Sequence, residues 1–267
     1  LVARYFPPST RRRIQQAGAG YADATGNLRL ELDRPSLFLR NVGEDRDPWR
    51  GPGRPRGSLK GSAAARVVRA LVDFAPPYSV PELVERSGVS TGATYRVVAF
   101  LEEEDLLDRQ SRGPITTVRW RRLIERWSQD SGFQSSGAVR SFLFPRGLER
   151  LPAALRAASD LRYVVTGSLA AQDLAPYAPP RVAMIYVDDV GVVADGLGLR
   201  PVERGANALL AVDRDEVAFL RSREVEGIRM AAPSQAAADL LTGPGRSPSE
   251  GQALLDWMEA NEPLWRQ

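Results

Sequence analysis

The chain has 267 residues and contains neither histidine nor cysteine. This excludes a Ser-His-Asp or Cys-His nucleophile, a zinc site with nitrogen or sulfur ligands, haem or iron–sulfur ligation, and thiol redox chemistry. Carboxylates, arginine, tyrosine, serine, threonine and the single lysine, Lys60, remain for chemistry or binding. Any metal would therefore be a hard ion with oxygen ligands.

Charge is distributed unevenly along the chain. Residues 1–130 carry 22 basic and 16 acidic side chains, a net charge of +6, whereas residues 131–267 carry 14 basic and 17 acidic side chains, a net charge of −3. We therefore expect a polyanion to bind the first half. The longest apolar run, 182–187, has six residues, far short of the roughly 20 that a membrane helix needs, and Leu1 does not open a signal peptide. We expect a cytoplasmic protein.

Two polar stretches divide the chain into three segments. Residues 43–61 are rich in glycine, proline and charge, and residues 129–137 are polar and contain glycine, as is typical of linkers. We predict an N-terminal β-hairpin segment with a basic linker over 1–57, a second domain over 58–130 and a third over 131–267.

The first segment has a weak pattern of its own. A short basic helix is predicted over 8–16, and alternating apolar residues over 28–32 and 36–40 predict a β-hairpin around Asp33-Arg34-Pro35. The string YADATGNLRLEL resembles the last strands of restriction-endonuclease-like domains. Within it, Asp23 and Asn27 are predicted to form a turn.

The second segment opens with the signals of two helices. Apolar residues at helical spacing predict a first helix over 62–71. Ser79-Val80-Pro81-Glu82 is a capping-box sequence, which predicts a second helix that runs to about Ser87. Gly88 is expected to form a tight turn, with Val89 buried behind it.

A third helix is predicted to begin at Ser90, its N-cap. Its buried face would consist of Ala93, Val97, Phe100 and Leu101. The start of its other face would then expose five residues of types that reach base edges and phosphates in a major groove: Thr91, Gly92, Thr94, Tyr95 and Arg96.

A β-hairpin is predicted to follow, with strands over 106–109 and 115–120 and Arg112 at its tip. The block VPELVERSGVSTGATYRVVAFLEEEDLLDR and this hairpin resemble the winged helix-turn-helix domains of bacterial transcription regulators. The resemblance implies a DNA-binding domain in which Arg112 enters a minor groove or contacts a phosphate. Asp105 departs from the family, which often has glycine there, and the acidic run 102–105 leaves open a protein–protein module instead.

The linker before this domain adds further basic residues. Gly53-Arg54-Pro55-Arg56-Gly57 resembles the core of AT-hook segments, which lay arginines along a narrow minor groove. A plain flexible linker is the alternative. If the segment meets DNA, then Arg54, Arg56 and Lys60 are the expected phosphate contacts.

The third segment alternates helices and strands, which predicts a small mixed sheet with helices and an α+β class for the whole chain. Helices are predicted over 146–159, 168–174, 215–221, 234–241 and 250–259, and strands over 162–166, 182–187, 208–212 and 228–231. Trp257 is expected to be a packing residue of the last helix.

TGSLAAQDLAPYAPPRVAMIYVDD resembles the core of nucleotidyltransferase-like domains. Active members hold magnesium through carboxylates at the start of the second strand. Pro179, Pro180, Arg181, Val182 and Ala183 occupy those positions here. Asp188 and Asp189 lie at the far end of that strand and point to opposite faces, so a turn or helix cap is the expected role. The resemblance implies a copy without metal or other cofactor, used for interaction or small-ligand sensing.

With IRMAAPSQAAADLLT near the end, the order of domains resembles the AbiEi family of type IV antitoxins and related regulators. Its members bind operator DNA, and some counteract a nucleotidyltransferase toxin. We predict a repressor, not an enzyme, that binds a palindromic operator in double-stranded DNA as a homodimer through Ser90, Thr91, Thr94, Tyr95, Arg96 and Arg112. An antitoxin or scaffold that binds a partner toxin through the third segment, and an active nucleotidyltransferase, are the competing hypotheses.

Overall fold

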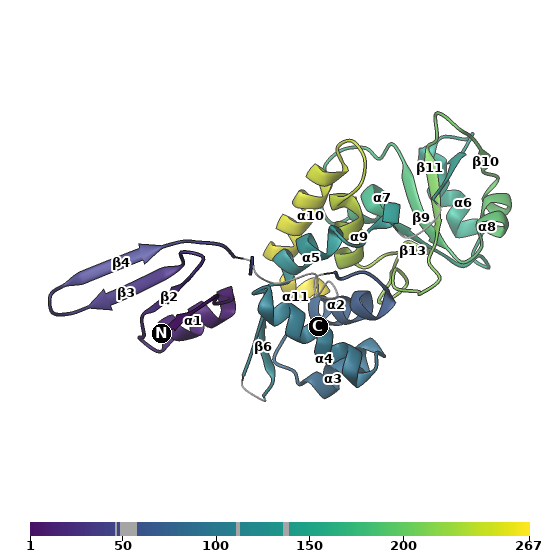
Figure 1. Cartoon of the computed structure of the whole chain (residues 1–267). Helices are drawn as coiled ribbons and strands as arrows, with labels where there is room; N and C mark the ends of the chain where they lie inside the picture. Colours follow the sequence, from purple (N-terminus) through teal and green to yellow (C-terminus); the bar gives the residue numbers. More distant parts are fainter. Residues whose placement is uncertain (46, 49–57, 111–112, 136–138) are drawn as a thin grey trace.

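The computed structural model describes residues 1–45, 47–48, 58–110, 113–135 and 139–267. Within these residues the chain forms three sheets of four, seven and two strands, with helices against them, which confirms the α+β class. Figure 1 shows the four-stranded sheet extending to one side, the seven-stranded sheet at the upper right, and the two-stranded sheet below. None of the helices in these ranges has the length and apolar content to span a bilayer.

The N-terminal part contains the predicted helix and hairpin. Helix α1 (Pro8–Gln16) lies beside a sheet of order β1-β2-β3-β4, formed by β1 (Val2–Ala3), β2 (Tyr21–Asp23), β3 (Leu28–Leu32) and β4 (Leu37–Asn41). Asp23 accepts hydrogen bonds from the backbone of Thr25 and Asn27 at 3.0 and 3.2 Å, so both Asp23 and Asn27 form the expected turn. Burial opposes ionisation of Asp23, but hydrogen bonds from Thr25, Phe6 and Asn27 lower its pKa.

Residues 58–130 contain the three predicted helices and the hairpin. The helices are α2 (Ser62–Asp73), α3 (Val80–Ser87) and α4 (Thr91–Glu103), and the hairpin strands are β5 (Leu107–Arg109) and β6 (Ile115–Val118). A further helix, α5 (Trp120–Ser128), was not predicted. Its buried residues Trp120, Leu123, Ile124 and Trp127 have helical spacing, but the expected strand ran to Trp120 and the expected linker began at Gln129.

The C-terminal part is built on a mixed sheet of order β10-β7-β11-β9-β8-β13-β12. The pairs β11·β9 and β8·β13 are parallel, and the other neighbours are antiparallel. All five residues of β9 are buried, as the apolar run predicted. The strands are β7 (Arg140–Leu143), β8 (Tyr163–Thr166), β9 (Ala183–Val187), β10 (Arg200–Pro201), β11 (Ala208–Val212), β12 (Arg223–Val225) and β13 (Ile228–Met230).

The helices of this part are α6 (Leu151–Ala157), α7 (Gly167–Ala171), α8 (Val190–Leu197), α9 (Pro233–Leu241), α10 (Ser247–Ala260) and α11 (Glu262–Trp265), with two 3-10 turns at Phe133–Ser135 and Leu148–Arg150. Trp257 is half-buried against the core, in agreement with a packing role. The helix expected over 215–221 is wrong. Positive φ angles at Glu216 and Arg221 are incompatible with a helix there, and Asp213 accepts the amides of Asp215 and Ala218 in a turn.

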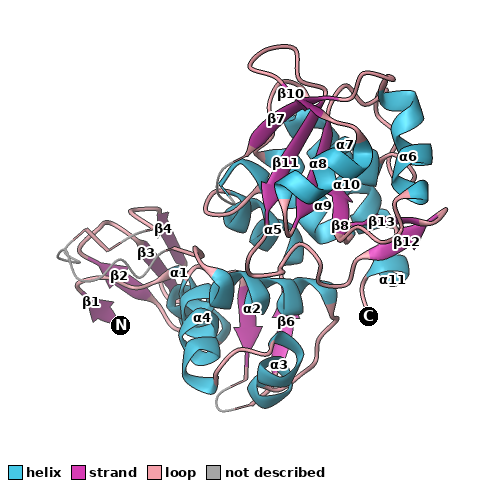
Figure 2. Ribbon diagram, turned by 90° about the vertical axis from the view of Figure 1, so that its right-hand side faces the viewer, coloured by secondary structure: helices cyan, strands magenta, loops and turns pink. Residues whose placement is uncertain are grey.

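The end of the chain returns to the helices of residues 58–130. Helices α2 and α5 both contact α9. The rings of Trp120 and Trp265 meet edge to face with centroids 5.0 Å apart, and the Gln267 amide donates to the Asp73 carbonyl at 3.0 Å. Figure 2, turned by 90°, shows α3 and α4 at the end of the molecule that is opposite the seven-stranded sheet, with α1 next to α4.

Candidate nucleic-acid interface

The turn between α3 and α4 forms as its sequence predicts. The Glu82 amide donates to Ser79 Oγ at 3.3 Å and the Ser79 amide donates to Glu82 Oε2 at 2.6 Å, which completes the capping box. Gly88 ends α3 with a φ of 64°, in the left-handed region that favours glycine. Val89 is buried. These features fix the direction in which α4 leaves the turn.

Helix α4 buries Phe100 and Leu101 as expected, but the rest of its buried stripe differs from the prediction. Thr94, predicted to be exposed and to reach DNA, is fully buried, and its hydroxyl donates to the Ser90 carbonyl at 3.2 Å. Thr94, Val98 and Leu101 lie at positions i, i+4 and i+7 and form the buried stripe, while Ala93 and Val97 are half-buried. Thr94 therefore cannot contact a base without rearrangement of the helix.

The exposed start of α4 retains the other predicted residues. Thr91, Tyr95 and Arg96 are exposed, with 44% of the Tyr95 side chain accessible to solvent. Ser90 occupies the N-cap position and is exposed, but its side chain makes no capping hydrogen bond, contrary to expectation. Because the Ser90 hydroxyl makes no capping hydrogen bond, it is available to a ligand.

The acidic run at the end of α4 is paired with arginines from the described residues. Arg12 of α1, Arg119 and Arg122 surround Asp105, the last two at 3.6 and 3.8 Å. Glu102 pairs with Arg109 at 3.4 Å, and Glu104 lies 3.9 Å from Arg126. These arginines reduce the negative field that the run would otherwise place beside the exposed face of α4.

The backbone conformation of Asp105 explains how an aspartate can replace the glycine that is frequent at this position. Its φ is 64°, in the left-handed region that glycine favours and that Asp tolerates better than most residues. The carboxylate that this position adds is the one that Arg12 contacts. Asp105 therefore ends the helix and also joins α1 to the junction of α4 and β5.

The hairpin β5–β6 is attached to the start of α3. Tyr78 and Ile115 exchange backbone hydrogen bonds of 3.2 and 2.9 Å. Burial raises the pKa of Tyr78, whose hydroxyl donates to the Leu71 carbonyl at 3.1 Å. The predicted tip residue Arg112 lies outside the described residues, as do the linker residues Arg54 and Arg56.

Lys60 lies on a different surface from Tyr95 and Arg96. It is exposed and lines a cavity of about 1060 Å³ between the start of α2, the end of α5 and the carboxyl ends of β9 and β11. The charged side chains of this lining are mainly acidic, an environment that does not favour a phosphate contact at Lys60. They are Lys60, Arg140, Arg214, Asp130, Asp188, Asp189, Asp213 and Asp215.

A buried polar network joins α2 to the C-terminal part, and sequence reasoning missed it. Arg69 is 1% exposed and donates to Asp73 Oδ2 at 2.9 Å, Gln235 Oε1 at 3.1 Å, and the carbonyls of Val217 and Leu220. Ser234 Oγ donates to the other oxygen of Asp73 at 2.5 Å. The sequence did contain one signal of this network. Arg69 lies in an otherwise apolar helix face, four residues before Asp73, where the two side chains can pair.

The network continues to Asp239, which is fully buried in α9. Asp239 accepts hydrogen bonds from Thr166 Oγ1 at 2.6 Å, Tyr186 OH at 2.8 Å and Gln235 Nε2 at 3.1 Å. Burial raises the pKa of Asp239 to about 6, although these hydrogen bonds and Arg69 lower it. The fold thus holds a carboxyl group that titrates between the normal range for Asp and neutral pH.

Side chains at the start of α10 hydrogen-bond to the Gly167-Ser168 element and to one another. Ser168 Oγ donates to Glu250 Oε2, and Arg246 Nε donates to Glu250 Oε1 at 2.7 Å. At the other end of β9, Asp189 Oδ1 accepts the Val192 amide at 2.9 Å and caps α8, as expected. In the ranges that the structure describes, no group of three acidic side chains is placed to hold a metal ion.

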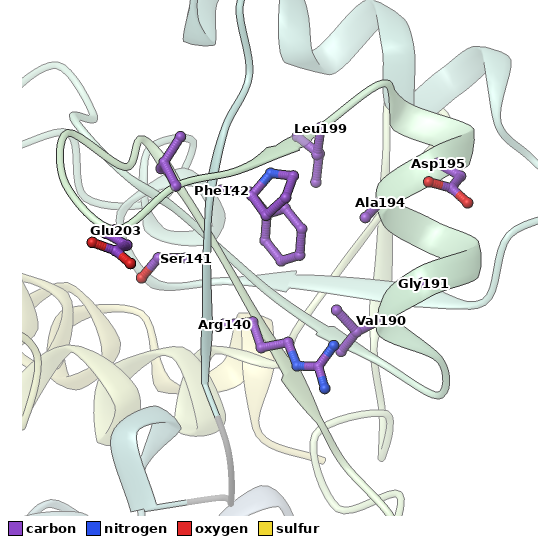
Figure 3. A pocket seen from close by; sticks show the side chains of 11 residues that line it. Arg140, Ser141, Phe142, Val190, Gly191, Ala194, Asp195, Leu199 and Glu203 are labelled. Carbon is purple, nitrogen blue, oxygen red and sulfur yellow. The ribbon is translucent and has the colours of Figure 1, made fainter.

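A second cavity, of about 500 Å³, lies among β7, β10 and α8 (Figure 3). Phe142, Ala194 and Leu199 give it an apolar wall, and the exposed side chains of Asp195 and Glu203 lie at its edge. It includes none of the residues predicted to bind DNA.

The comparisons with known proteins are negative. No family model, curated protein or solved structure matches the chain. The exposed start of α4, with Tyr95 and Arg96, is the candidate interface.

Proposed function

We propose that residues 58–130 are a winged helix-turn-helix DNA-binding domain and that the protein is a cytoplasmic repressor. In this proposal α4 is the recognition helix, with Ser90, Thr91, Tyr95 and Arg96 in the major groove, and the β5–β6 hairpin is the wing. The protein binds a palindromic operator as a homodimer. Arg112, Arg54 and Arg56 remain candidate phosphate or minor-groove contacts.

One observation carries the proposal: α4 presents an aromatic side chain and an arginine beside its N-terminus, on an end of the molecule that α3 and the hairpin share. Arg96 makes no hydrogen bond or ion pair with any described residue, whereas arginines pair with Glu102, Glu104 and Asp105 close by. An unpaired guanidinium at the start of such a helix can bind guanine or phosphate.

A second candidate function is supported by the C-terminal part. We propose that it is a nucleotidyltransferase-like domain without metal ligands, which binds a partner toxin as an antitoxin would. Ser168 of the Gly-Ser element is hydrogen-bonded to Glu250, which Arg246 also holds. Together with the absence of carboxylates at the start of β9, this favours an interaction role over nucleotidyl transfer.

A mobility-shift titration tests the main proposal. The probe is duplex DNA from upstream of the protein's own coding sequence, and the control is an unrelated duplex of equal length. We expect binding to the upstream probe to be at least roughly 1000-fold tighter, as is usual for specific operators. Equal affinity for both duplexes, or no binding, would overturn the repressor proposal and leave the partner-protein candidate.

A further inference from the structure

Strand β4 leaves a complete strand edge exposed. It is the last strand of the four-stranded sheet, and in the described part of the chain only β3 pairs with it. All five of its residues are exposed, with 56% of Phe38 and 44% of Leu39 accessible. Figure 1 shows that the β3–β4 hairpin projects away from the rest of the protein. An edge of this kind presents unpaired amide and carbonyl groups to another chain.

The two faces of the hairpin differ in chemistry. The register pairs Leu28 with Asn41, Leu30 with Leu39 and Leu32 with Leu37, so five leucines share one face. The opposite face pairs Arg29 with Arg40 and Glu31 with Phe38. There the Arg29 guanidinium lies 5.2 Å from the centre of the Phe38 ring and binds Glu31 at 2.5 Å.

This apolar, exposed edge is unusual for a strand with solvent as its only neighbour. Natural edge strands avoid pairing by short length, inward charges, proline or bulges. Strand β4 has five residues, a regular register with β3 over its whole length, and three large apolar side chains in succession, Leu37, Phe38 and Leu39. These features suit a strand that another strand covers.

We propose that β4 pairs antiparallel with β4 of a second copy of this chain, about a two-fold axis through Leu39. Leu39 is the midpoint of Leu37–Asn41, so this axis pairs all five residues of the strand. Leu39 then faces its own counterpart, and Phe38 faces Arg40 of the partner subunit. The leucine rows of the two sheets become continuous, because directly opposed residues point to the same face.

The number of paired residues selects this register. An axis through Arg40 pairs only three residues of the strand and places two arginines directly opposite one another. An axis through Phe38 also pairs only three. With the axis at Leu39, each Arg40 instead lies against an aromatic ring, as Arg29 does within one copy. The interface is isologous and closes as a dimer, which gives the proposed repressor its two-fold symmetry.

The absence of cysteine allows a direct test by disulfide crosslinking. Leu39→Cys places one thiol on each side of the axis, with Cβ atoms about 4.5–5.5 Å apart, close to the distance that a disulfide spans. We expect most of this variant to become a covalent dimer under mild oxidation, as seen on a non-reducing gel.

Two matched variants fix the register. Phe38→Cys separates the two thiols diagonally by about 7–8 Å. Leu32→Cys separates them by three strand spacings across the sheet and four residues along it, roughly 20 Å in all, so both should crosslink at least roughly tenfold more slowly. Faster crosslinking of Phe38→Cys than of Leu39→Cys would overturn the Leu39 axis. Crosslinking of all three at equal rates would overturn the pairing.

Sedimentation equilibrium of the unmodified protein, without DNA, gives an independent readout. We expect a dimer that Leu39→Lys converts to a monomer while the circular dichroism spectrum is unchanged. A monomer at tens of micromolar before substitution would overturn the inference even if a cysteine variant failed to fold. Because no DNA is present, a monomer that still binds the upstream duplex would refute this pairing and leave the proposed DNA-binding domain intact.

Discussion

Tyr95 and Arg96 carry the functional argument at the scale of single residues. Both are exposed near the start of α4, and the Arg96 guanidinium has no partner among the described residues. Thr94, from the same predicted set, is buried instead. The helical periodicity of the sequence left the boundary of the buried stripe ambiguous by one position, because a threonine can enter the core when its hydroxyl bonds to the preceding turn.

Asp239 is a fully buried residue whose ionisation should affect stability. Burial raises its pKa to about 6 in the folded protein, above the value near 4 that it has when unfolded. Between these values the folded state binds more protons at Asp239 than the unfolded state does, so the contribution of Asp239 to stability is fully present below about pH 4 and is lost as the pH rises through 6. A difference of about two pKa units corresponds to about 3 kcal/mol.

We therefore expect the free energy of unfolding of the parent protein, relative to that of Asp239→Asn, to fall by about 2 kcal/mol between pH 4 and pH 7. Urea unfolding at a series of pH values measures this difference. Asp160→Asn is the control, because Asp160 is exposed. A parent–Asp239→Asn difference that is constant with pH would contradict the assignment.

At the scale of elements, local signals fix where α3 and α4 begin. Ser79 caps α3 with a hydrogen bond to the Glu82 amide, whereas Ser90 stands at the N-cap of α4 without such a bond. The two serines occupy equivalent positions on adjacent helices. They therefore separate the contribution of the capping hydrogen bond from that of residue type.

Ser79→Ala should lower the free energy of unfolding by about 1 kcal/mol, because it removes the acceptor for an amide at the start of α3. Ser90→Ala should change it by less than about 0.5 kcal/mol. Urea unfolding of the two variants at one pH gives both values. Equal losses for the two serines would show that the capping box does not act as described.

Elements with strong local signals were predicted, and those that depend on partners distant in sequence were not. The capping box and Gly88 defined α3, and alternation defined the β3–β4 hairpin. Strands β7, β10 and β12 were missed because their hydrogen-bonding partners lie in other parts of the chain. Helix α8 was missed although a helix cap was one expected role of Asp189, because Gly191 and Gly196 weaken the helical pattern that follows it.

At the scale of the whole molecule, the buried polar network around Arg69 joins α2 to α9. Arg69 is held by Asp73 and Gln235 and by two carbonyl groups, and Ser234 completes the shell of Asp73. The candidate interface was partly readable from sequence, since it lies within α4. The buried polar network could not be predicted from the sequence, because Gln235 and Ser234 come more than 160 residues after Arg69.

Arg69→Met should destabilise the protein by about 3–5 kcal/mol, because it leaves the Asp73 carboxylate buried without its main counterion. The control is Arg121→Met, which breaks ion pairs with the exposed Asp256 and Glu259 and should cost at most about 1 kcal/mol. Chemical unfolding followed by tryptophan fluorescence measures both. A loss of unfolding free energy for Arg69→Met no larger than that for Arg121→Met would contradict the stabilising role of the buried polar network.

The central claim is that the exposed start of α4 binds DNA, and a salt titration of operator binding tests it most directly. Dissociation constants for the upstream duplex are measured by fluorescence anisotropy for the parent, for Arg96→Glu and for Arg200→Glu, whose arginine is equally exposed but lies on β10 at the far edge of the seven-stranded sheet. We expect affinity to fall steeply with salt, Arg96→Glu to weaken binding roughly tenfold or more, and Arg200→Glu to bind like the parent. Affinity that is independent of salt, or equal losses for the two arginines, would contradict the claim.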